Sequence, residues 1–361
     1  MEIGLYTFGD LPVGTGGGEA ARRRLGEIVA AARLADEAGL AVFGVGEHHR
    51  PDYAISAPSV VLGALAAATR RIRLTTAVTI LSSDDPVRVA EQFATLDLLS
   101  GGRAEITVGR GAFIESFPLF GYDLNDYDAL YDEKLALFLR LAGGGATDWH
   151  GRFRPALAGA TISPPVPGDD GRIWIGAGGT PASAIRAGQA GLPLNLANIG
   201  GEPARFQPFI DLYRRAGTAA GHDAGRLKVA ISGHCHVGRD SRSARDAFFP
   251  YYARYIGHNL PAGRDGWKVT RPDFDRLAAP RGPLFVGSPA EIVDKILYEH
   301  SLFRHDRFMA QIDIGGLPFA EVAAVIGRLA GEVLPQVNRA LGAGAAPETS
   351  PAPEICRPPA G

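Results

Sequence analysis

Short apolar stretches rich in β-branched residues recur along the chain, and each is followed by a longer stretch whose apolar residues return every three or four positions. The short stretches are typical of buried strands, and the longer spacing is typical of amphipathic helices. The predicted strands cover residues 3–8, 42–47, 72–81, 104–109, 173–177, 193–199, 227–237 and 307–314. Because eight strands that alternate with helices close a parallel barrel, we expect an α/β fold of the (β/α)8 TIM-barrel class.

The predicted helices carry residues that start and stop helices. The first has apolar residues spaced through 25–35 and ends at Gly39, a residue that readily adopts the left-handed conformation after a helix. The helix after the third strand begins at Asp85-Pro86, where the carboxylate can cap the first turn. In the last helix, over 319–341, Pro335 predicts a bend or a break.

Three segments interrupt the alternation. We expect a small hairpin with a Pro-rich connection near residues 145–166, and a long loop over the barrel mouth near 258–283. Residues 342–361 are rich in Ala, Gly and Pro without periodicity, so we expect a disordered tail. The predicted organisation is one barrel domain over 1–341 followed by this tail.

Composition narrows the class of protein. Hydrophobic residues make up 46% of the 361 residues and charged residues 21%, which is enough to bury a large core. A net charge of −2 without a basic cluster argues against a nucleic-acid partner. Two cysteines do not make a disulfide framework, and neither a signal sequence nor an apolar stretch of roughly 20 residues is present. We therefore expect a cytoplasmic protein with no membrane partner.

The second predicted strand ends in Glu47-His48-His49, and active sites of barrels lie at the carboxyl ends of their strands. His48 is a candidate acid or base because imidazole titrates near neutral pH. Successive strand residues point to opposite faces, so at most one of the two histidines should face the barrel axis. Two interpretations stay open beside catalysis: a histidine that only satisfies loop backbone groups, and a metal-dependent hydrolase built from His48, His49, Asp84 and Asp85.

Two strand ends carry signals for phosphate binding. At the fourth strand, Gly109 lets the backbone approach a ligand, and Arg110 offers planar paired donors. At the fifth, free backbone amides and hydroxyl groups coincide with the positive end of a helix. The residues involved there are Gly178, Gly179, Thr180 and Ser183. Each stretch is also compatible with an ordinary turn or a surface ion pair.

Two further strands attract attention. The sixth ends in a glycine-rich stretch with Asn198 and Gly200, which suits a flat aromatic ligand or completes a phosphate site. The seventh contains His234-Cys235-His236, which is suggestive of a metal site. Alternation places Cys235 opposite both histidines, so we favour a packed strand over metal ligation.

In their order and spacing, these motifs resemble the bacterial luciferase-like, flavin-dependent monooxygenase family. The similarity covers residue 1 to about residue 341. It rests on Glu47-His48-His49, residues 84–92 and 96–103, Gly109-Arg110-Gly111, residues 117–121, Trp149-His150-Gly151, residues 176–179 and Gly191-Leu192-Pro193.

The resemblance implies a cofactor and a reaction. It implies FMN at the carboxyl-terminal mouth of the barrel, with reduced FMN supplied by a separate flavin reductase and used with O2 to oxygenate a small organic substrate. It also implies a homodimer. The residues that it assigns are His48 as acid or base, Ala77 and Thr79 beneath the flavin ring, and Arg110, Gly179, Thr180 and Ser183 at the phosphate. Asn198 stands near the place where luciferase has a Trp, so neither light emission nor an aldehyde substrate is implied.

Two alternatives remain within the same fold. A sister branch of the family uses a deazaflavin coenzyme for hydride transfer without O2. Other members bind flavin without catalysing a reaction, and the presence of His48 favours activity over that alternative.

Overall fold

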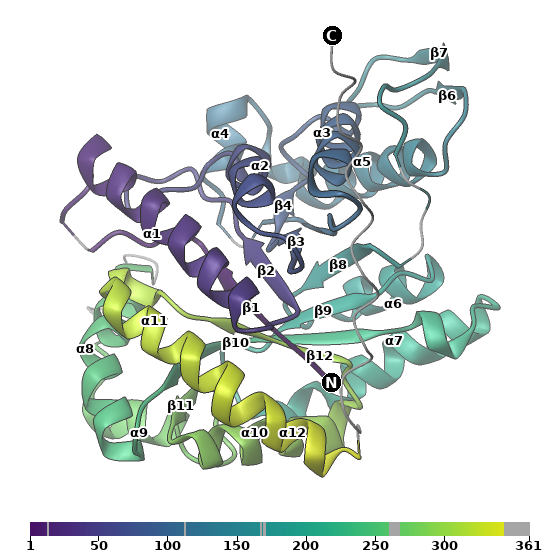
Figure 1. Ribbon diagram of the computed structural model, residues 1–361. Coiled ribbons are helices and arrows are strands. Elements are labelled where there is room, and N and C mark those ends of the chain that lie inside the picture. Colours follow the sequence, from purple (N-terminus) through teal and green to yellow (C-terminus); the bar gives the residue numbers. More distant parts are fainter. Residues whose placement is uncertain (13, 112, 167, 169–170, 260–267, 343–361) are drawn as a thin grey trace, which may run out of the picture.

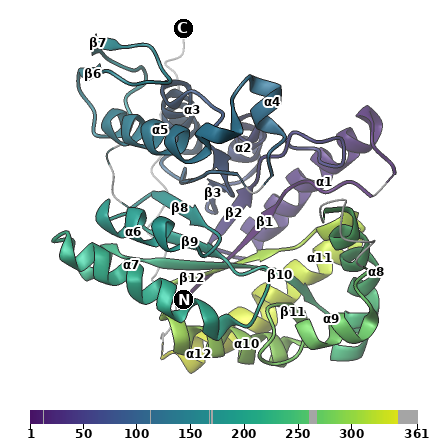
Figure 2. The ribbon, with the colours of Figure 1, turned by 180° about the vertical axis from the view of Figure 1, so that it is seen from behind.

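The computed structural model describes residues 1–12, 14–111, 113–166, 168, 171–259 and 268–342. Parallel strands occupy the centre and helices surround them (Figure 1), as the view from behind also shows (Figure 2). The strands are β1 (Glu2–Thr7), β2 (Val42–Val45), β3 (Arg73–Thr76), β4 (Thr79–Ile80), β5 (Ile106–Gly109), β8 (Ile173–Ala177), β9 (Leu194–Ala197), β10 (Val229–Val237), β11 (Phe285–Gly287) and β12 (Arg307–Gln311). A separate hairpin consists of β6 (Thr147–Trp149) and β7 (Leu157–Ala160).

The helices lie outside the strands. They are α1 (Gly18–Glu37), α2 (Pro58–Ala68), α3 (Pro86–Ser100), α4 (Ser116–Phe120), α5 (Tyr127–Ala142), α6 (Pro181–Gln189), α7 (Gln207–Ala219), α8 (Ser241–Asn259), α9 (Arg271–Leu277), α10 (Pro289–Phe303), α11 (Phe319–Arg328) and α12 (Leu334–Ala340). Short 3-10 turns are η1 (Leu124–Asp126), η2 (Pro203–Phe206), η3 (Ala224–Arg226) and η4 (Ile314–Gly316), and η5 (Leu329–Val333) is a π-helical turn. No helix within the described ranges has the length and apolar character needed to span a bilayer.

The strand order is that of a barrel. Neighbouring strands follow β3-β2-β1-β12-β10-β9-β8-β5-β4, and the main pairs are parallel. β3 and β4 stand at the two ends of this order, although they follow one another directly in the chain. A parallel bridge from Leu74 of β3 to Ala104, just before β5, joins the two ends and closes the barrel. All eight predicted strands are present, so the (β/α)8 TIM-barrel prediction is confirmed.

The prediction of one continuous strand over 72–81 was wrong. β3 pairs with β2, whereas β4 pairs with β5, and the cis peptide bond between Ala77 and Val78 lies between the two strands. The sequence alone could not reveal this break, because all ten residues fit a buried strand. As a consequence, Ala77 and Val78 enter the barrel mouth.

The other insertions differ in how well they were predicted. The hairpin near 145–166 is confirmed by β6 and β7, which stand away from the barrel beside α5 (Figure 1). The stretch near 258–283 is more than a loop, because α9 forms there and its Phe274 packs on Phe248 and Tyr252. Residues 260–267 of that stretch, and 343–361 of the expected tail, lie outside the described residues. β11, which pairs with the end of β10, was missed because three residues are too short a pattern.

Helix ends follow the predicted chemistry. Gly39 has a positive φ of 80°. Asp85 caps α3 by accepting from the backbone amides of Val87 and Arg88, as its position before Pro86 predicted. Near Pro335, the last helix changes to the π-helical turn η5 before α12 begins, in agreement with the predicted irregularity.

Successive side chains along each strand point alternately into the barrel and toward the surrounding helices. Ile3 and Leu5 of β1 are fully buried in the large hydrophobic core. Their neighbours Glu2 and Tyr6 take the alternate positions, which face the barrel axis, where Glu2 joins a polar network and Tyr6 lines a cavity. The barrel lumen therefore contains polar side chains beside a small apolar cluster of Tyr6, Val42 and Met309, whereas the space between strands and helices is apolar.

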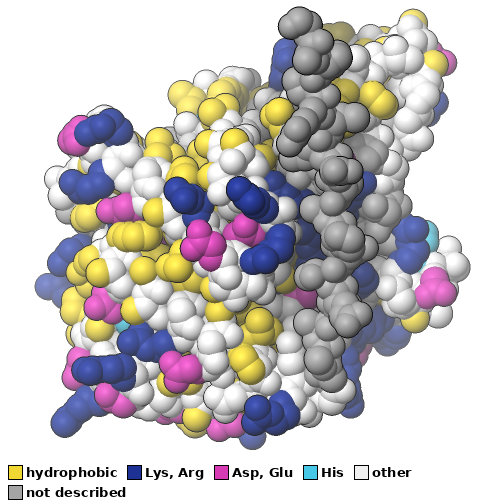
Figure 3. Space-filling model, in the orientation of Figure 1, with side chains coloured by type: hydrophobic (Ala, Val, Ile, Leu, Met, Phe, Trp, Pro, Cys, Tyr) yellow, Lys and Arg dark blue, Asp and Glu magenta, His cyan; other side chains and the backbone are white. Residues whose placement is uncertain are grey.

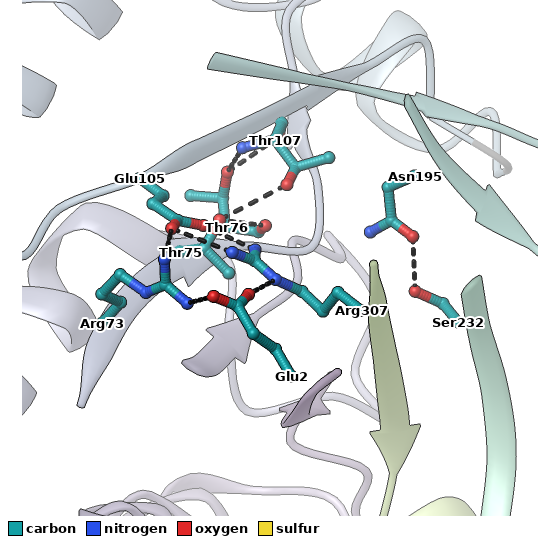
Figure 4. A network of polar contacts seen from close by, with 9 residues as sticks. All are labelled: Glu2, Arg73, Thr75, Thr76, Glu105, Thr107, Asn195, Ser232 and Arg307. Atoms are coloured by element: carbon teal, nitrogen blue, oxygen red, sulfur yellow. Dashed lines mark hydrogen bonds and ion pairs between the residues drawn. The ribbon is translucent and has the colours of Figure 1, made fainter. Parts of the chain in front are cut away.

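Charged residues close the amino-terminal end of the barrel. The Arg307 guanidinium donates to Glu105 Oε2 at 2.6 Å, to Glu105 Oε1 at 3.1 Å and to Glu2 Oε2 at 2.8 Å. Arg73 also pairs with Glu2 and Glu105. Figure 4 shows these side chains converging, with Asn195 and Ser232 facing one another nearby. This network closes the bottom of the barrel and leaves the opposite end for a site.

Candidate active site

A cavity of about 380 Å³ lies at the carboxyl ends of the barrel strands. Residues from β1, β4, β5, β8, β9, β10 and β12 line it, together with Glu47 and His48 after β2 and with Ala77 and Val78 between β3 and β4. Of the predicted site residues, it brings together His48, Ala77, Gly109, Arg110, Gly178 and Thr180. A cavity of this size in this position is the expected place for a small-molecule site in a barrel enzyme.

One end of the cavity has the chemistry of a phosphate site. Arg110 Nη2 donates to Thr180 Oγ1 at 3.2 Å and to Ser183 Oγ at 3.4 Å, and the two hydroxyl oxygens are 2.8 Å apart. Thr180 is the N-cap residue of α6, but its side chain makes no capping hydrogen bond. The amides of the first turn, two hydroxyl groups and a guanidinium thus gather at one helix end, which suits an anion.

The backbone before α6 makes room for a ligand. Gly179 has φ of 100°, and an added Cβ would lie 2.8 Å from Phe206 Cε1, so a side chain is excluded there. Gly178 is exposed, with open space where a Cβ would stand. Asp128 accepts from Arg110 Nη1 at 2.5 Å, and the Tyr127 ring lies 5.2 Å from the guanidinium carbon. These contacts hold the guanidinium at the cavity mouth.

Val78 contributes apolar surface to the cavity. An added Cβ on Gly109 would lie 2.8 Å from Val78 Cγ2, and one on Gly176 would lie 2.6 Å from Val78 Cγ1. The two glycines therefore allow Val78 to lie against the backbones of β5 and β8. Such a surface fits the face of a planar ring, and its position beside Arg110 would place the phosphate of the same ligand at α6.

His48 faces this cavity from the end of β2. Its Nδ1 is 3.4 Å from Glu115 Oε1, and its ring packs on Phe8, Tyr53 and Phe113. Its Nε2 has no hydrogen-bond partner among the described residues. Partial burial alone would raise the pKa of Glu115, but the hydrogen bond with His48 and nearby positive charge lower that pKa. One imidazole nitrogen is thus held by a carboxylate, while the other is buried without a partner in the part of the chain that the structure describes.

His49 lies on the other side of the strand, as alternation predicted. Its Nε2 is 2.8 Å from Glu47 Oε1, and Glu47 Oε2 accepts from the Ile80 amide at 2.9 Å. His49 and Asp84 line a second cavity of about 260 Å³ between the barrel and helices α2 and α3. His48 is absent from that lining, and among the described residues no three His, Cys, Asp or Glu side chains are placed to hold a metal ion.

Some predicted site residues lie away from the large cavity. Thr79 lines the second cavity, with its side chain opposite to that of Val78. Asn198 is fully buried and donates from Nδ2 to Glu299 Oε1 at 2.9 Å, so its side chain points toward α10. Gly200 is exposed in the turn after β9. The strand ends indicated by the sequence border the large cavity, but the sequence could not tell which side of the strand each residue would face.

Among the lining residues that the sequence did not identify as site residues are Tyr6, His234 and Gln311. Burial raises the pKa of Tyr6 and lowers the pKa of His234 to about 4, so both side chains are neutral near pH 7. We interpreted His234 as part of a packed strand and did not consider that alternation along β10 would direct its side chain into the barrel. Gln311 carried a signal that could have been used, because an amide at a predicted buried strand position is unusual.

Comparison with known proteins gives a consistent family. A family model described as luciferase-like monooxygenase matches residues 1–306. The N-acetyl-S-alkylcysteine monooxygenase of Bacillus subtilis is 35% identical over 50% of this chain and 53% of that protein. The oxygenase component of the flavin-dependent trigonelline monooxygenase of Acinetobacter baylyi is 22% identical over 86% of this chain and 89% of that protein.

Solved structures share the fold. The monooxygenase RslO1 from Streptomyces bottropensis aligns with a TM-score of 0.78 and 28% identity, over 93% of this chain and 99% of that one. The FMN complex of the oxygenating constituent of 3,6-diketocamphane monooxygenase from Pseudomonas putida aligns with a TM-score of 0.72 and 18% identity. The alignment covers 93% of this chain and 99% of that one. An F420-dependent secondary alcohol dehydrogenase aligns with a TM-score of 0.70 and 18% identity, over 93% of this chain and 98% of that one. The resemblance seen in the sequence is confirmed, and the chain belongs to the luciferase-like monooxygenase family.

Proposed function

We propose that this protein is an FMN-dependent monooxygenase that uses reduced flavin and O2 to oxygenate a small organic substrate, with His48 as acid or base. One observation carries the proposal: a phosphate-binding group, Arg110 with Thr180, and a histidine with a free nitrogen line the same cavity.

The residues present fit FMN. Arg110, Thr180 and Ser183 would hold the phosphate at the amino end of α6, where guanidinium and hydroxyl donors meet. Ala77 and Val78 would lie against the isoalloxazine ring. When bound, reduced FMN supplies the two electrons with which one atom of O2 becomes water while the other enters the substrate.

The contribution of this chain is positioning and proton transfer. Glu115 holds His48 Nδ1, so that the neutral imidazole presents the Nε2 lone pair to the cavity as a base, and the protonated imidazole presents a donor there. Aromatic rings around His48 exclude water from its faces. We propose that Glu115 is a positioning residue and that His48 exchanges the proton with the substrate.

The source of electrons is a second protein in this proposal. The Acinetobacter relative is named as an oxygenase component, and that name supports a separate flavin reductase for this protein as well. The substrate itself is not indicated by these relatives, whose names refer to chemically different compounds.

The test is a titration of the purified protein with oxidised FMN, reduced FMN under anaerobic conditions, and the deazaflavin coenzyme. The visible absorption spectrum of retained flavin reports binding, and O2 consumption by the reduced complex reports monooxygenase chemistry. Retention of FMN with O2 consumption is the expected result. Binding of the deazaflavin alone would move the protein to the hydride-transfer branch, and failure of all three ligands would overturn the proposal.

We further propose a homodimer that associates through α2 and α3. Val60 on α2 and Leu98 and Leu99 on α3 are 72%, 68% and 67% exposed, and contiguous exposed apolar surface often marks an interface between proteins. Figure 3 shows hydrophobic side chains gathered at the surface over α2 and α4. Light scattering should give about twice the chain mass of 38.0 kDa, and Leu98→Glu should lower it toward the monomer.

A further inference from the structure

Three polar side chains lie at one level on three adjacent strands. Gln311 of β12 is in register with Tyr6 of β1 on one side and with His234 of β10 on the other. Because residues in register on parallel strands point to the same face, all three are directed into the barrel, where they line the large cavity. We refer to Tyr6, His234 and Gln311 as the neutral wall.

Gln311 is the central member of the neutral wall. Its side chain is fully buried, and neither its Nε2 nor its Oε1 has a hydrogen-bond partner among the described residues. A buried amide without partners destabilises the folded protein, and native proteins rarely keep one without a reason. An unpaired amide at the wall of a cavity indicates a ligand group that pairs with it, and the amide offers both a donor and an acceptor.

The neighbours of Gln311 extend this pattern. His234 Nδ1 is also buried without a partner in the part of the chain that the structure describes, and its ring lies edge-on to Tyr252 and Tyr255. One layer deeper, Ser232 donates to Asn195 Oδ1 at 2.7 Å, and Figure 4 shows the two side chains directed at one another. The wall therefore rests on side chains that are already paired.

Charge is absent from this wall. The described charged residues that line the cavity are Glu47 and Arg110. Glu47 is occupied by His49 and the Ile80 amide, and Arg110 belongs to the phosphate end. The Asp10 and Asp313 carboxyl groups lie outside the lining but close to Tyr6, and burial raises the pKa of both, which favours their uncharged forms. An ionised group against the neutral wall would therefore lose its hydration without gaining a partner of opposite charge.

We propose that the neutral wall binds an uncharged group that both donates and accepts hydrogen bonds, such as an amide, with Gln311 as the residue that selects it. The inference deepens the proposed monooxygenase function, because this group would orient the organic substrate in the cavity that also holds His48. The same chemistry has a second source, the imide edge of the flavin ring. The test below separates the two sources.

The probes are benzamide, benzoate and benzamidinium, which have nearly the same shape and differ in charge. Binding is measured by isothermal titration calorimetry to flavin-free and FMN-loaded protein. We expect benzamide to bind most tightly, and Gln311→Leu to weaken it about tenfold, as for the loss of one or two hydrogen bonds. Gln311→Glu should reverse the preference in favour of benzamidinium. Gln336→Leu, on the exposed face of α12, is the matched control and should change nothing.

The outcomes distinguish the source of the group. Benzamide binding to FMN-loaded protein, with FMN affinity unchanged in Gln311→Leu, identifies the organic substrate as the ligand. Displacement of benzamide by FMN, with FMN affinity lowered in Gln311→Leu, identifies the flavin imide. Benzamide that binds wild type no better than the two ions, or equally well to Gln311→Leu, overturns the inference. Because the flavin-free arm needs no cofactor, a failure to bind FMN would refute the proposed function and leave this result intact.

Discussion

Replacing Arg110 with Ala tests whether the amino end of α6 binds the phosphate of the cofactor. The Arg110 side chain is 22% exposed and reaches Thr180 and Ser183 at 3.2 and 3.4 Å, so a phosphate held by these hydroxyl groups would be within reach of the guanidinium. A hydrogen bond to a charged group contributes about 1.5–3 kcal/mol. The variant should therefore bind FMN roughly 10- to 150-fold more weakly than wild type.

The decisive comparison is between FMN and riboflavin, which lacks the phosphate. Quenching of flavin fluorescence on titration with protein gives both dissociation constants. Arg110→Ala should weaken FMN alone and leave riboflavin unchanged, since the ring would still lie on Val78 and its neighbours. The FMN affinity of Arg110→Lys should lie between those of wild type and Arg110→Ala, because a lysine keeps the charge but loses the planar pair of donors. Arg22→Ala, on the exposed face of α1, is the control for a lost surface charge.

Two results would refute this reasoning. Equal weakening of FMN and riboflavin would mean that Arg110 supports the ring pocket or the fold and does not contact the phosphate. Unchanged FMN affinity in Arg110→Ala would place the phosphate elsewhere. In the second case the hydroxyl pair at Thr180 and Ser183 would need another explanation, such as an ordinary helix start.

Three further predictions address the other parts of the molecule. His48→Gln should lower turnover about 10²- to 10⁴-fold with FMN affinity unchanged, and full turnover would exclude His48 from proton transfer. Arg307→Met should lower the free energy of unfolding by about 1.5–3 kcal/mol in urea denaturation, because the buried Glu105 loses two charged hydrogen bonds and keeps only its ion pair with Arg73; a loss below 1 kcal/mol would contradict the role assigned to the network. Burial raises the pKa of Glu299 from 4.5 to about 8, so between these values the unfolded chain loses a proton that the folded protein keeps, and stability falls as the pH rises. The stability of Glu299→Gln, measured as its free energy of unfolding minus that of wild type, should therefore increase between about pH 5 and pH 8. The increase should be at most about 1.4 kcal/mol per pH unit, and a difference that does not change with pH would disprove the pKa shift.

The class of fold and the ends of several elements followed from local pattern. The alternation of apolar strands with helical spacing was sufficient for the eight-stranded barrel, because each strand buries both faces wherever it stands in the closed sheet. Asp85 capped α3 and Gly39 ended the α1 region as expected, because capping depends on residues within one turn. His48 and Arg110 could be nominated because the carboxyl ends of barrel strands meet at one face.

The tertiary structure alone decided which of these residues share a cavity. The stretch 72–81 broke into two strands because its halves pair with different neighbours, a matter of closure that no local pattern contains. The same break brought Val78 into the mouth and turned Thr79 away from it. Asn198 turned to Glu299, which is 101 positions away in the chain. Gln311 gained its place beside Tyr6 and His234 only through the register of β12 with β1 and β10, because strand register is set by pairing across the sheet and not by the sequence of one strand.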